Sequence, residues 1–374
     1  MSTVLVAGAS DIGRIRERNE DSFVIGDLDA GELWDGDGPL ESAGPRGPFI
    51  IVCDGMGGAV GGEVASELAT RAAWRDLSGA HATSDPQVFA RLLRRAVRAA
   101  NQRVWDESRR EPTLRGMGTT LSAAGIAGRH LVVAQVGDSR VYVHRGGVLT
   151  QVTRDQTLTS ALVGTGKHTE AEAEALVGGA TILQALGVTD DVEPSLSIVD
   201  LRRDDRVLVC SDGLYNQLGP ATMEAILDGR KGPEAIAASL CEAARAAGGA
   251  DNITAIVLFA SGEELPAATS ADDLPRFVEF DPREEGERAL TSTSYVARRL
   301  AARAGIGDDP GPPVVPATGQ HAVVPRGRVA PGMTLADVAG PAARRAGSPS
   351  RAWLVAALLA GAIAGVLGWY LAGL

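Results

Sequence analysis

The stretch from residue 118 to residue 152 constrains the fold most, because it carries four short apolar segments separated only by turns that contain glycine. The sequence Arg145-Gly146-Gly147 is typical of a hairpin turn. Because no helix separates these segments, they are expected to form a largely antiparallel sheet rather than a doubly wound one. The predicted strands cover residues 119–126, 131–136, 140–144 and 148–152.

The rest of the chain carries further strand patterns and several helical ones. The longest predicted helix begins at Pro86 and ends near residue 108. Asp85 or Ser84 can cap this helix, and its arginines are expected to form a solvated face rather than a nucleic-acid interface. Other helices are predicted at residues 62–77, 170–177, 221–227 and 234–247, and other strands at residues 4–11, 23–25, 206–210 and 253–259.

One of these apolar strands ends in a carboxylate. Residues 49–52 run through Cys53 into Asp54, which is followed by a turn rich in glycine, Gly55-Met56-Gly57-Gly58. Glycine allows a ligand to approach the backbone, and a carboxylate beside a free carbonyl oxygen suits Mg²⁺ or Mn²⁺. The alternative is an ordinary Asp-Gly turn that closes a strand.

Three more carboxylates stand at the ends of predicted strands, namely Asp138, Asp212 and Asp251. Four such positions are difficult to explain as turns alone. Converging carboxylates repel one another, and cations relieve that repulsion. The pattern therefore favours a two-metal hydrolytic centre, in which a water bridging the metals is activated and attacks the substrate.

The segment 13–22 places three arginines and three acids ahead of the strand predicted at residues 23–25. It can be a solvated loop, or it can supply an arginine that grips an oxyanion beside acids that order metal-bound water. Residues 27–47 are rich in glycine, proline and acids, and are expected to be an exposed loop or hairpin insertion.

Composition excludes some classes of function. The net charge of −11 argues against binding to nucleic acid, because a polyanion would be repelled. The cysteines Cys53, Cys210 and Cys241 lack zinc-site spacing and are expected to be buried thiols in a reducing compartment. Residues 1–8 show no secretory signal pattern.

Taken together, these residues resemble the metal-dependent protein phosphatases of the PP2C type. The resemblance implies an α+β fold, a four-layer α-β-β-α sandwich of two antiparallel β-sheets flanked by helices, with a metal centre in a cleft at one edge. It covers residues 1–260 as a phosphatase domain. The motifs, in the order of the family, are Arg16-Glu17-Arg18-Asn19-Glu20-Asp21, Asp54-Gly55-Met56-Gly57-Gly58, Gly118-Thr119-Thr120-Leu121, Val136-Gly137-Asp138-Ser139-Arg140, Leu183-Gln184-Ala185-Leu186-Gly187, Ser211-Asp212-Gly213-Leu214 and Asp251-Asn252-Ile253-Thr254.

The resemblance also implies which residues hold metal. Asp54 would bridge two Mn²⁺ or Mg²⁺ ions, and the carbonyl of Gly55 would add a ligand to one of them. Asp212 and Asp251 would hold the other ion. Asp138 would help Asp212 to bind a weaker third ion, as in bacterial members of the family.

Other roles are implied in the same way. Arg16 matches the arginine that holds the substrate phosphate. Glu20 and Asp21 would order the waters on the metals, and Asn252 would support the neighbouring ligand.

The chain departs from the family pattern at three places, and the second of them, the flap, bears on substrate choice. Met56 stands where many eukaryotic members carry a histidine proposed as a general acid. The region 153–187 corresponds to a mobile flap, but it reads Asp155-Gln156 near its start and Gly179-Ala180-Thr181 near its end. The acidic insertion 27–47 is longer than usual and is interpreted as a tolerated loop rather than an element that shapes substrate access.

The composition changes after residue 260. Residues 261–351 are rich in acids and then in Pro, Gly, Ala and Arg, and are predicted to be a mostly disordered linker, with a short helix near residues 289–304.

Residues 352–374 are predicted to be a transmembrane helix. From Trp353 onward no residue is charged, and a helix of this length would span about 33 Å. Aromatic residues lie near both ends, and arginines that include Arg351 precede the segment, which predicts that the N-terminal domain faces the cytoplasm.

The function expected from all these features is that of a membrane-tethered cytoplasmic phosphatase. It would remove phosphate from phosphoserine and phosphothreonine on proteins by direct attack of metal-activated water, opposing a Ser/Thr kinase. Two alternatives stay open. The chain can be a catalytically weak phosphoprotein-binding module at the membrane, or a phosphatase of small phosphomonoesters.

Overall fold

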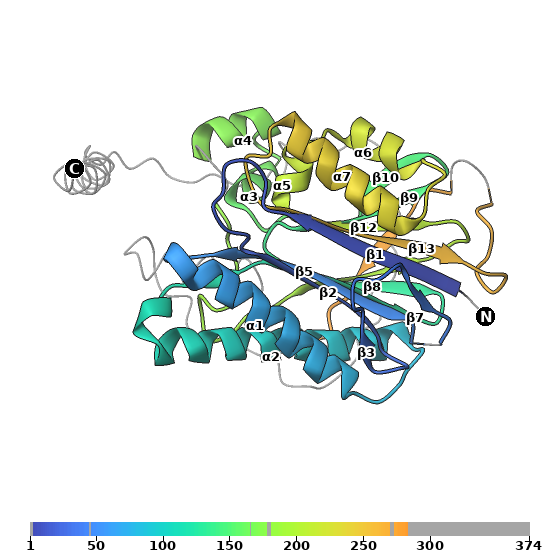
Figure 1. The fold of residues 1–374 in the computed structure, drawn as a ribbon, viewed down its shortest axis with the longest axis horizontal. Coiled ribbons are helices and arrows are strands. Elements are labelled where there is room, and N and C mark those ends of the chain that lie inside the picture. The colour runs from blue at the N-terminus through green and yellow to red at the C-terminus, as the bar shows by residue number, and fades with distance from the viewer. Residues whose placement is uncertain (1–2, 45, 165, 178–180, 270–272, 283–374) are drawn as a thin grey trace, which may run out of the picture. The chain divides into compact units, whose positions relative to one another are not determined.

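The structure, a computed structural model, describes residues 3–282 apart from residues 45, 165, 178–180 and 270–272. It contains two β-sheets packed face to face with helices on both outer sides (Figure 1). The first sheet contains, in spatial order, β10 (Val148–Gln151), β9 (Arg140–Arg145), β12 (Arg206–Cys210), β13 (Ile253–Ser261), β1 (Thr3–Asp11) and β4 (Leu40–Ser42). The second contains β14 (Phe277–Glu279), β11 (Ser195–Asp200), β8 (His130–Val136), β7 (Leu121–Ala127), β5 (Pro48–Met56), β2 (Asp21–Asp27) and β3 (Glu32–Leu33), while β6 (Gly118–Thr119) pairs with β5.

Neighbouring strands in both sheets are antiparallel, as the run of strands without intervening helices predicts. The hairpin between β9 and β10 turns through Gly146 and Gly147, whose φ angles of 59° and 85° lie in the left-handed region. Such angles are strained for other residues, so two consecutive glycines fix the register here.

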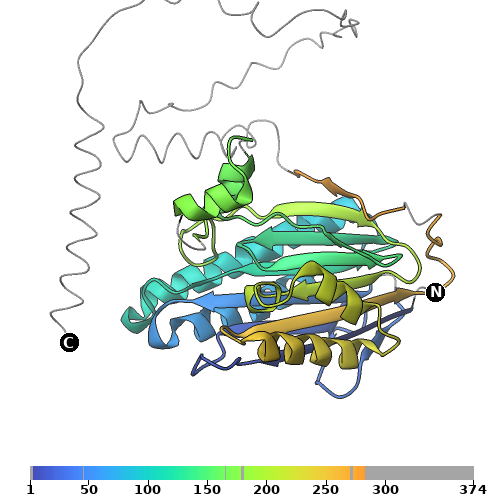
Figure 2. The same cartoon turned by 90° about the horizontal axis from the view of Figure 1, so that it is seen from above.

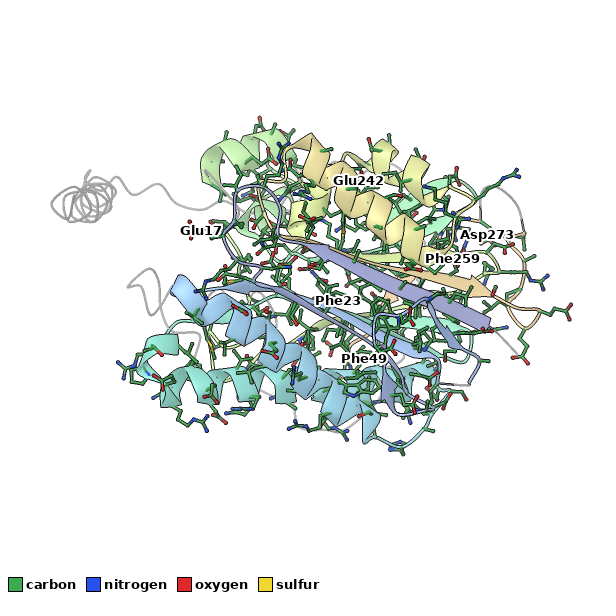
Figure 3. The ribbon with its side chains drawn as sticks, in the orientation of Figure 1. Glu17, Phe23, Phe49, Glu242, Phe259 and Asp273 are labelled. Carbon is green, nitrogen blue, oxygen red and sulfur yellow. The ribbon has the colours of Figure 1, made fainter. Side chains whose placement is uncertain are left out.

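Alternation along β5 explains how one strand serves two cores. Ile50 and Val52 point into the apolar layer between the sheets, whereas Phe49, Ile51 and Cys53 point toward the helices of the second sheet. Figure 3 labels Phe49 on the helix side and Phe23, from β2, whose ring packs against the layer between the sheets. Burial on both faces makes β5 a rigid support for whatever follows it.

One layer of helices covers the outer face of each sheet. The second sheet is covered by α1 (Gly58–Ser78) and α2 (Pro86–Arg110), joined through η1 (Pro112–Leu114) to β6. The first sheet is covered by α5 (Asp212–Tyr215), α6 (Pro220–Leu227) and α7 (Pro233–Ala247). Asp85 caps α2, since its carboxylate accepts hydrogen bonds from the backbone of Gln87 and Val88.

The predicted flap is partly helical. It contains α3 (Leu158–Gly164), which the sequence did not predict, and α4 (Glu170–Val177), which it did. These helices project from one end of the sandwich (green in Figure 2). Isolated β-bridges join Thr157 to Ile182 at the base of the flap, and Leu186, near the end of the flap, to Thr119.

The insertion 27–47 is mostly exposed, as predicted, and its first part forms a short hairpin in which β3 returns antiparallel to β2. Its two short strands pair with different sheets, β3 with β2 and β4 with β1. The segment therefore crosses from one sheet to the other at the edge of the sandwich.

The domain boundary predicted at residue 260 is too early. The segment that follows has an acidic composition that favours disorder, yet Leu265 is only 2% exposed and β14 extends the second sheet by pairing with β11. Asp273 also forms ion pairs with Arg145 and Arg202. One apolar anchor, one ion-pair cluster and one edge strand thus hold residues that composition alone assigns to a linker.

The rest of the predicted linker, the helix near residues 289–304 and the membrane span at residues 352–374 lie outside the described residues. Among the residues that the structure describes, no helix is both long enough and apolar enough to cross a membrane.

Candidate metal centre

The four predicted carboxylates lie at one end of the sandwich, where β5 runs into α1 (left in Figure 1). Asp54 lies near the end of β5 and Asp138 lies in the turn between β8 and β9. Asp212 is the first residue of α5, directly after β12, and Asp251 precedes β13. Burial first, and then repulsion from the other carboxylates, raises the pKa of Asp54 well above its usual value.

Asp21 belongs to the same cluster. It stands opposite Asp54 in the pairing of β2 with β5, so both side chains emerge on one face. Its Oδ2 accepts hydrogen bonds from the hydroxyls of Ser211 (2.6 Å) and Thr254 (2.7 Å), whereas its buried Oδ1 has no partner. Burial and repulsion from Asp212 raise the pKa of Asp21 to about 7 despite these hydrogen bonds.

The pKa values of Asp212 and Asp138 are raised in the same way, by burial and by neighbouring carboxylates. Oδ1 of Asp212 is buried without a partner, and burial followed by repulsion from Asp251 raises the pKa of Asp212. Burial, and then repulsion from Asp212 and Asp155, raises the pKa of Asp138 to about 7. The structure therefore brings together carboxylates whose negative charge is not compensated by hydrogen bonds alone.

These observations fit divalent cations. Two buried carboxylate oxygens lack partners, on Asp21 and Asp212, and their pKa values are raised by burial and also by repulsion between carboxylates, which a cation would relieve. Within the described ranges, however, no three His, Cys, Asp or Glu side chains are already grouped around one metal position.

Arg16 forms an ion pair with Asp251 in this structure. The Nη2 atom of Arg16 donates to Oδ2 of Asp251 at 2.8 Å, and this bond raises the pKa of the guanidinium. The arginine supplies the positive charge that a metal would otherwise supply to this carboxylate.

Gly55 can only be glycine in this fold. A Cβ atom there would collide with the backbone carbonyl oxygens of Gly62 and Glu20. The amide of Gly55 also donates to the carbonyl of Glu20 at 3.1 Å, so the Arg16–Glu20 segment packs directly on the strand that carries Asp54. The glycine-rich turn therefore packs closely against neighbouring backbone, as its sequence suggests.

Asn252 holds that segment in place. Its Oδ1 accepts a hydrogen bond from the amide of Glu20 (2.8 Å), and its Nδ2 donates to the carbonyls of Ile12 (3.0 Å) and Arg18 (2.9 Å). Asn252 thus supports the whole loop that carries Arg16, in addition to neighbouring Asp251. Burial raises the pKa of Glu20 at the end of the loop.

A buried hydroxyl network supports Asp54 and was not predicted. The amide of Asp54 donates to Oγ1 of Thr120 (2.9 Å), whose hydroxyl is 2.7 Å from that of Ser139, and the hydroxyl of Thr119 donates to the carbonyl of Asp54 (2.8 Å). These residues fall inside the motifs quoted from the sequence, so polar residues flanking a predicted ligand were the available signal.

A second network joins the flap to Asp138. Arg140 donates to both carboxylate oxygens of Asp155, and its Cζ atom lies 3.6 Å from the centroid of the Tyr215 ring. The Tyr215 hydroxyl donates to the carbonyl of Asp138 (3.1 Å), and Gln156 accepts from the amide of Gly137 (3.0 Å). The unusual Asp155-Gln156 pair therefore anchors the start of the flap to the turn that carries Asp138.

Comparison with known proteins agrees with this geometry. The family model described as protein phosphatase 2C matches residues 40–248. The serine/threonine protein phosphatase PstP of Mycobacterium tuberculosis is 37% identical over 279 residues, which cover 71% of this chain and 48% of PstP. The chain thus spans about half the length of that relative.

Two further relatives are matched over nearly their whole length. The serine/threonine phosphatase stp of Listeria innocua is 34% identical over 252 residues, which cover 67% of this chain and 93% of stp. A crystal structure of the catalytic domain of PstP in complex with two manganese ions matches 70% of this chain and 100% of its own, with 35% identity and a TM-score of 0.57. From the family model, the relatives and the shared fold, we conclude that the chain belongs to the protein phosphatase 2C family.

Proposed function

We propose that this chain is a metal-dependent phosphatase of phosphoserine and phosphothreonine in proteins. The observation that carries the proposal is the cluster of buried carboxylates with unpartnered oxygens, which lies beside an arginine able to hold a phosphate. The names of the relatives, serine/threonine phosphatases, and the two manganese ions bound to PstP support it.

In the proposed site Asp54, the carbonyl of Gly55, Asp212 and Asp251 hold two Mn²⁺ or Mg²⁺ ions. Asp138 contributes with Asp212 to a weaker third site. When bound, the ions would supply an activated water and neutralise charge on the phosphoryl group. The raised pKa values of Asp54 and Asp138 fit this assignment, because both groups are more easily kept ionised beside a cation.

Arg16 has two partners in this proposal. In the structure it pairs with Asp251. A cation on Asp251 would weaken that pair and leave the guanidinium donors for the phosphate of the substrate, which they match in a bidentate fashion. Asn252 holds the Arg16 loop next to β13, and Glu20 and Asp21 would order the waters on the metals. Phosphate binding and metal binding are therefore expected to be cooperative.

The test uses the purified full chain with p-nitrophenyl phosphate and a phosphothreonine peptide, with and without Mn²⁺. Asp54→Asn and Asp212→Asn are expected to lose hydrolysis of both substrates, because each removes a charged ligand. Asp190→Asn, at an exposed position on the surface, serves as the matched control. Metal-dependent hydrolysis that survives in both site variants would disprove the site assignment.

The same preparation separates the alternatives. Calorimetric Mn²⁺ binding without turnover of any phosphopeptide would favour a phosphoprotein-binding module. A panel that compares phosphopeptides with small phosphomonoesters would identify a metabolite phosphatase by higher kcat/KM for the small substrates.

We also propose that residues 352–374 anchor the chain in a membrane, with the phosphatase domain in the cytoplasm and a Ser/Thr kinase as the opposing enzyme. The uncharged length of the segment and the arginines before it support this. Cell fractionation tests it: the full chain is expected in the membrane pellet and a chain ending at residue 351 in the supernatant. Equal amounts of the two proteins in the supernatant would disprove the anchor.

A further inference from the structure

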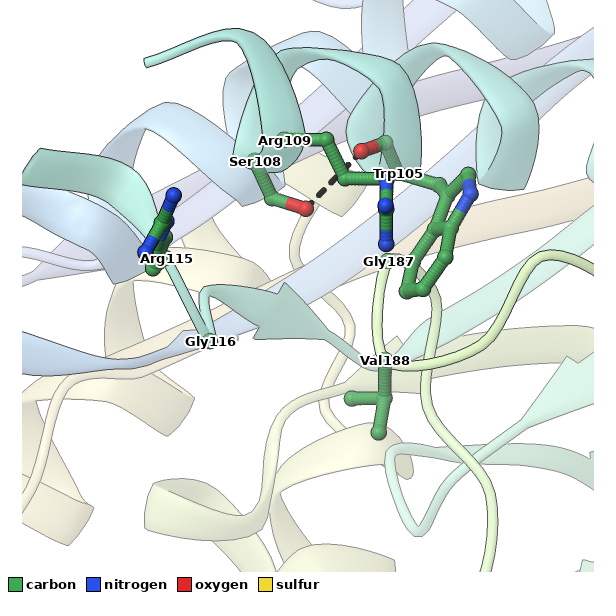
Figure 4. A pocket seen from close by; sticks show the side chains of 7 residues that line it. All are labelled: Trp105, Ser108, Arg109, Arg115, Gly116, Gly187 and Val188. Carbon is green, nitrogen blue, oxygen red and sulfur yellow. Dashed lines mark hydrogen bonds between the residues drawn. The ribbon is translucent and has the colours of Figure 1, made fainter. Parts of the chain in front are cut away.

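A pocket of about 360 Å³ lies outside the site described above, and none of the proposed metal ligands lines it. It forms where the end of α2 meets the segment that follows the flap (Figure 4). Figure 4 shows Arg115 on one side, Arg109 against Trp105 on the other, and Val188 below them. The lining is completed by Ser108, Gly116 and Gly187.

Two guanidinium groups determine what this pocket can bind. Arg109 is held in place by Trp105, since its Cζ atom lies 5.0 Å from the centroid of the indole ring. Arg115 is exposed and adjoins Gly116, around which a side chain would meet nothing within 4 Å. Across the described part of the chain, no carboxylate pairs with either guanidinium.

Neighbouring Arg110, in contrast to Arg109 and Arg115, has a carboxylate partner. It belongs to the same last turn of α2, yet its guanidinium donates to Glu107 at 2.6 Å. The hydroxyl of Ser108 is also engaged, because it donates to the carbonyl of Trp105 at 2.8 Å. The hydrogen-bond donors that remain for a ligand in the pocket are those of Arg109 and Arg115, which suit an oxyanion.

The pocket is linked to the metal centre through the backbone. Gly55 stands opposite Thr119, and Thr119 forms a β-bridge with Leu186. Two strand spacings of about 4.8 Å and two residues of about 3.3 Å separate Gly55 from Val188, which places the pocket on the order of 12 Å from the metal ligands. An extended peptide covers that distance in about three to five residues.

We propose that this pocket binds a second anionic side chain of the polypeptide substrate, acidic or phosphorylated, about three to five residues from the phosphoresidue at the metal centre. The inference rests on the proposed function and adds a substrate preference to it. Val188 and Trp105 would contact the aliphatic part of the bound side chain, and the two arginines would hold its oxyanion.

The test measures kcat/KM for a set of phosphothreonine peptides in which one glutamate is moved from position −5 to position +5, with glutamine at the same position as the neutral reference. The parent protein is expected to prefer glutamate over glutamine roughly fivefold at one position three to five residues from the phosphothreonine. Phosphoserine at that position should be preferred more strongly, and added salt should reduce both preferences.

The double variant Arg109→Gln/Arg115→Gln is expected to reduce the glutamate-to-glutamine ratio to about one, as removal of exposed charge contacts predicts. Arg110→Gln is the control, because it removes a positive charge from the same helix turn as Arg109 but outside the pocket; its ratio should equal that of the parent. A ratio that is the same in the double variant and in the parent would overturn the proposal.

Hydrolysis of p-nitrophenyl phosphate separates this inference from the proposed function. If the parent hydrolyses neither p-nitrophenyl phosphate nor the peptides, the proposed function fails. Fluorescence anisotropy with the same labelled peptides then decides the pocket by itself: weaker binding of the glutamate peptide to the double variant than to Arg110→Gln supports it, and equal binding overturns it.

Discussion

Asp138→Asn is expected to stabilise the metal-free protein while it weakens metal binding. The pKa of Asp138 is raised from 3.8 to about 7, and its residue is 4% exposed. As the pH rises, Asp138 ionises near pH 4 in the unfolded chain but only near pH 7 in the folded protein. The free energy of unfolding therefore decreases between about pH 4 and pH 7, and the decrease is complete above pH 7. That difference is equivalent to roughly 4 kcal/mol at pH 8.

The recovered energy is smaller than this upper limit, because a buried amide must also be desolvated; we expect about 2 kcal/mol. For a domain of this size that raises Tm by roughly 4–8 °C. The assay is thermal unfolding in EDTA at pH 8 and pH 5, where the gain should be smaller because less of the charge has formed. Saturating Mn²⁺ should raise the Tm of the parent more than that of Asp138→Asn.

Asp190→Asn is the control for loss of a carboxylate, because this residue is exposed. Its Tm should follow that of the parent at both pH values. A variant Asp138→Asn that is no more stable than the parent in EDTA at pH 8, or that gains equally at both pH values, would refute the electrostatic reasoning.

Three other changes test the architecture. Asn252→Ala removes three hydrogen bonds from the loop that carries Arg16 and should cost about 2–4 kcal/mol of unfolding free energy, measured by urea denaturation; a cost below about 0.5 kcal/mol would contradict the support assigned to it. Gly55→Ala should lower Tm and abolish hydrolysis because its Cβ meets backbone oxygens, whereas Gly164→Ala meets nothing and should match the parent. A chain ending at residue 282 should unfold cooperatively at a higher Tm than one ending at residue 260, which lacks buried Leu265 and the ion pairs of Asp273; equal Tm values would restore the earlier boundary.

Much of the architecture was accessible from local patterns. The strands around residues 119–152 and the helix α2 with its cap at Asp85 follow from alternation, helical spacing and capping, which are properties of a few neighbouring residues. α3 and β11 were missed because they are short, with seven and six residues, so neither carries a long periodic pattern. The segment after residue 260 was missed for a similar reason: pairing with β11 and ion pairs to distant arginines leave no periodic signal.

In the candidate site, too, local motifs could be predicted from the sequence and long-range contacts could not. Motifs identified Asp54, Asp138, Asp212 and Asp251, and the structure brings them together. The pairing of Arg16 with Asp251 joins two segments more than two hundred residues apart in the sequence, so no local pattern contains it. Their roles as metal ligands stay predictions until metal binding is measured.

The two β-bridges at the flap have a consequence for how substrate preference can change in this family member. Thr157 with Ile182 joins the two ends of the flap to each other, and Leu186 with Thr119 ties its second end to the strand that pairs with Gly55. Side chains between these ties contribute few buried residues to either sheet, Ala173 being the buried one of α4. Substitutions there can accumulate at little cost to folding, so specificity and catalysis can evolve as separate properties of one chain.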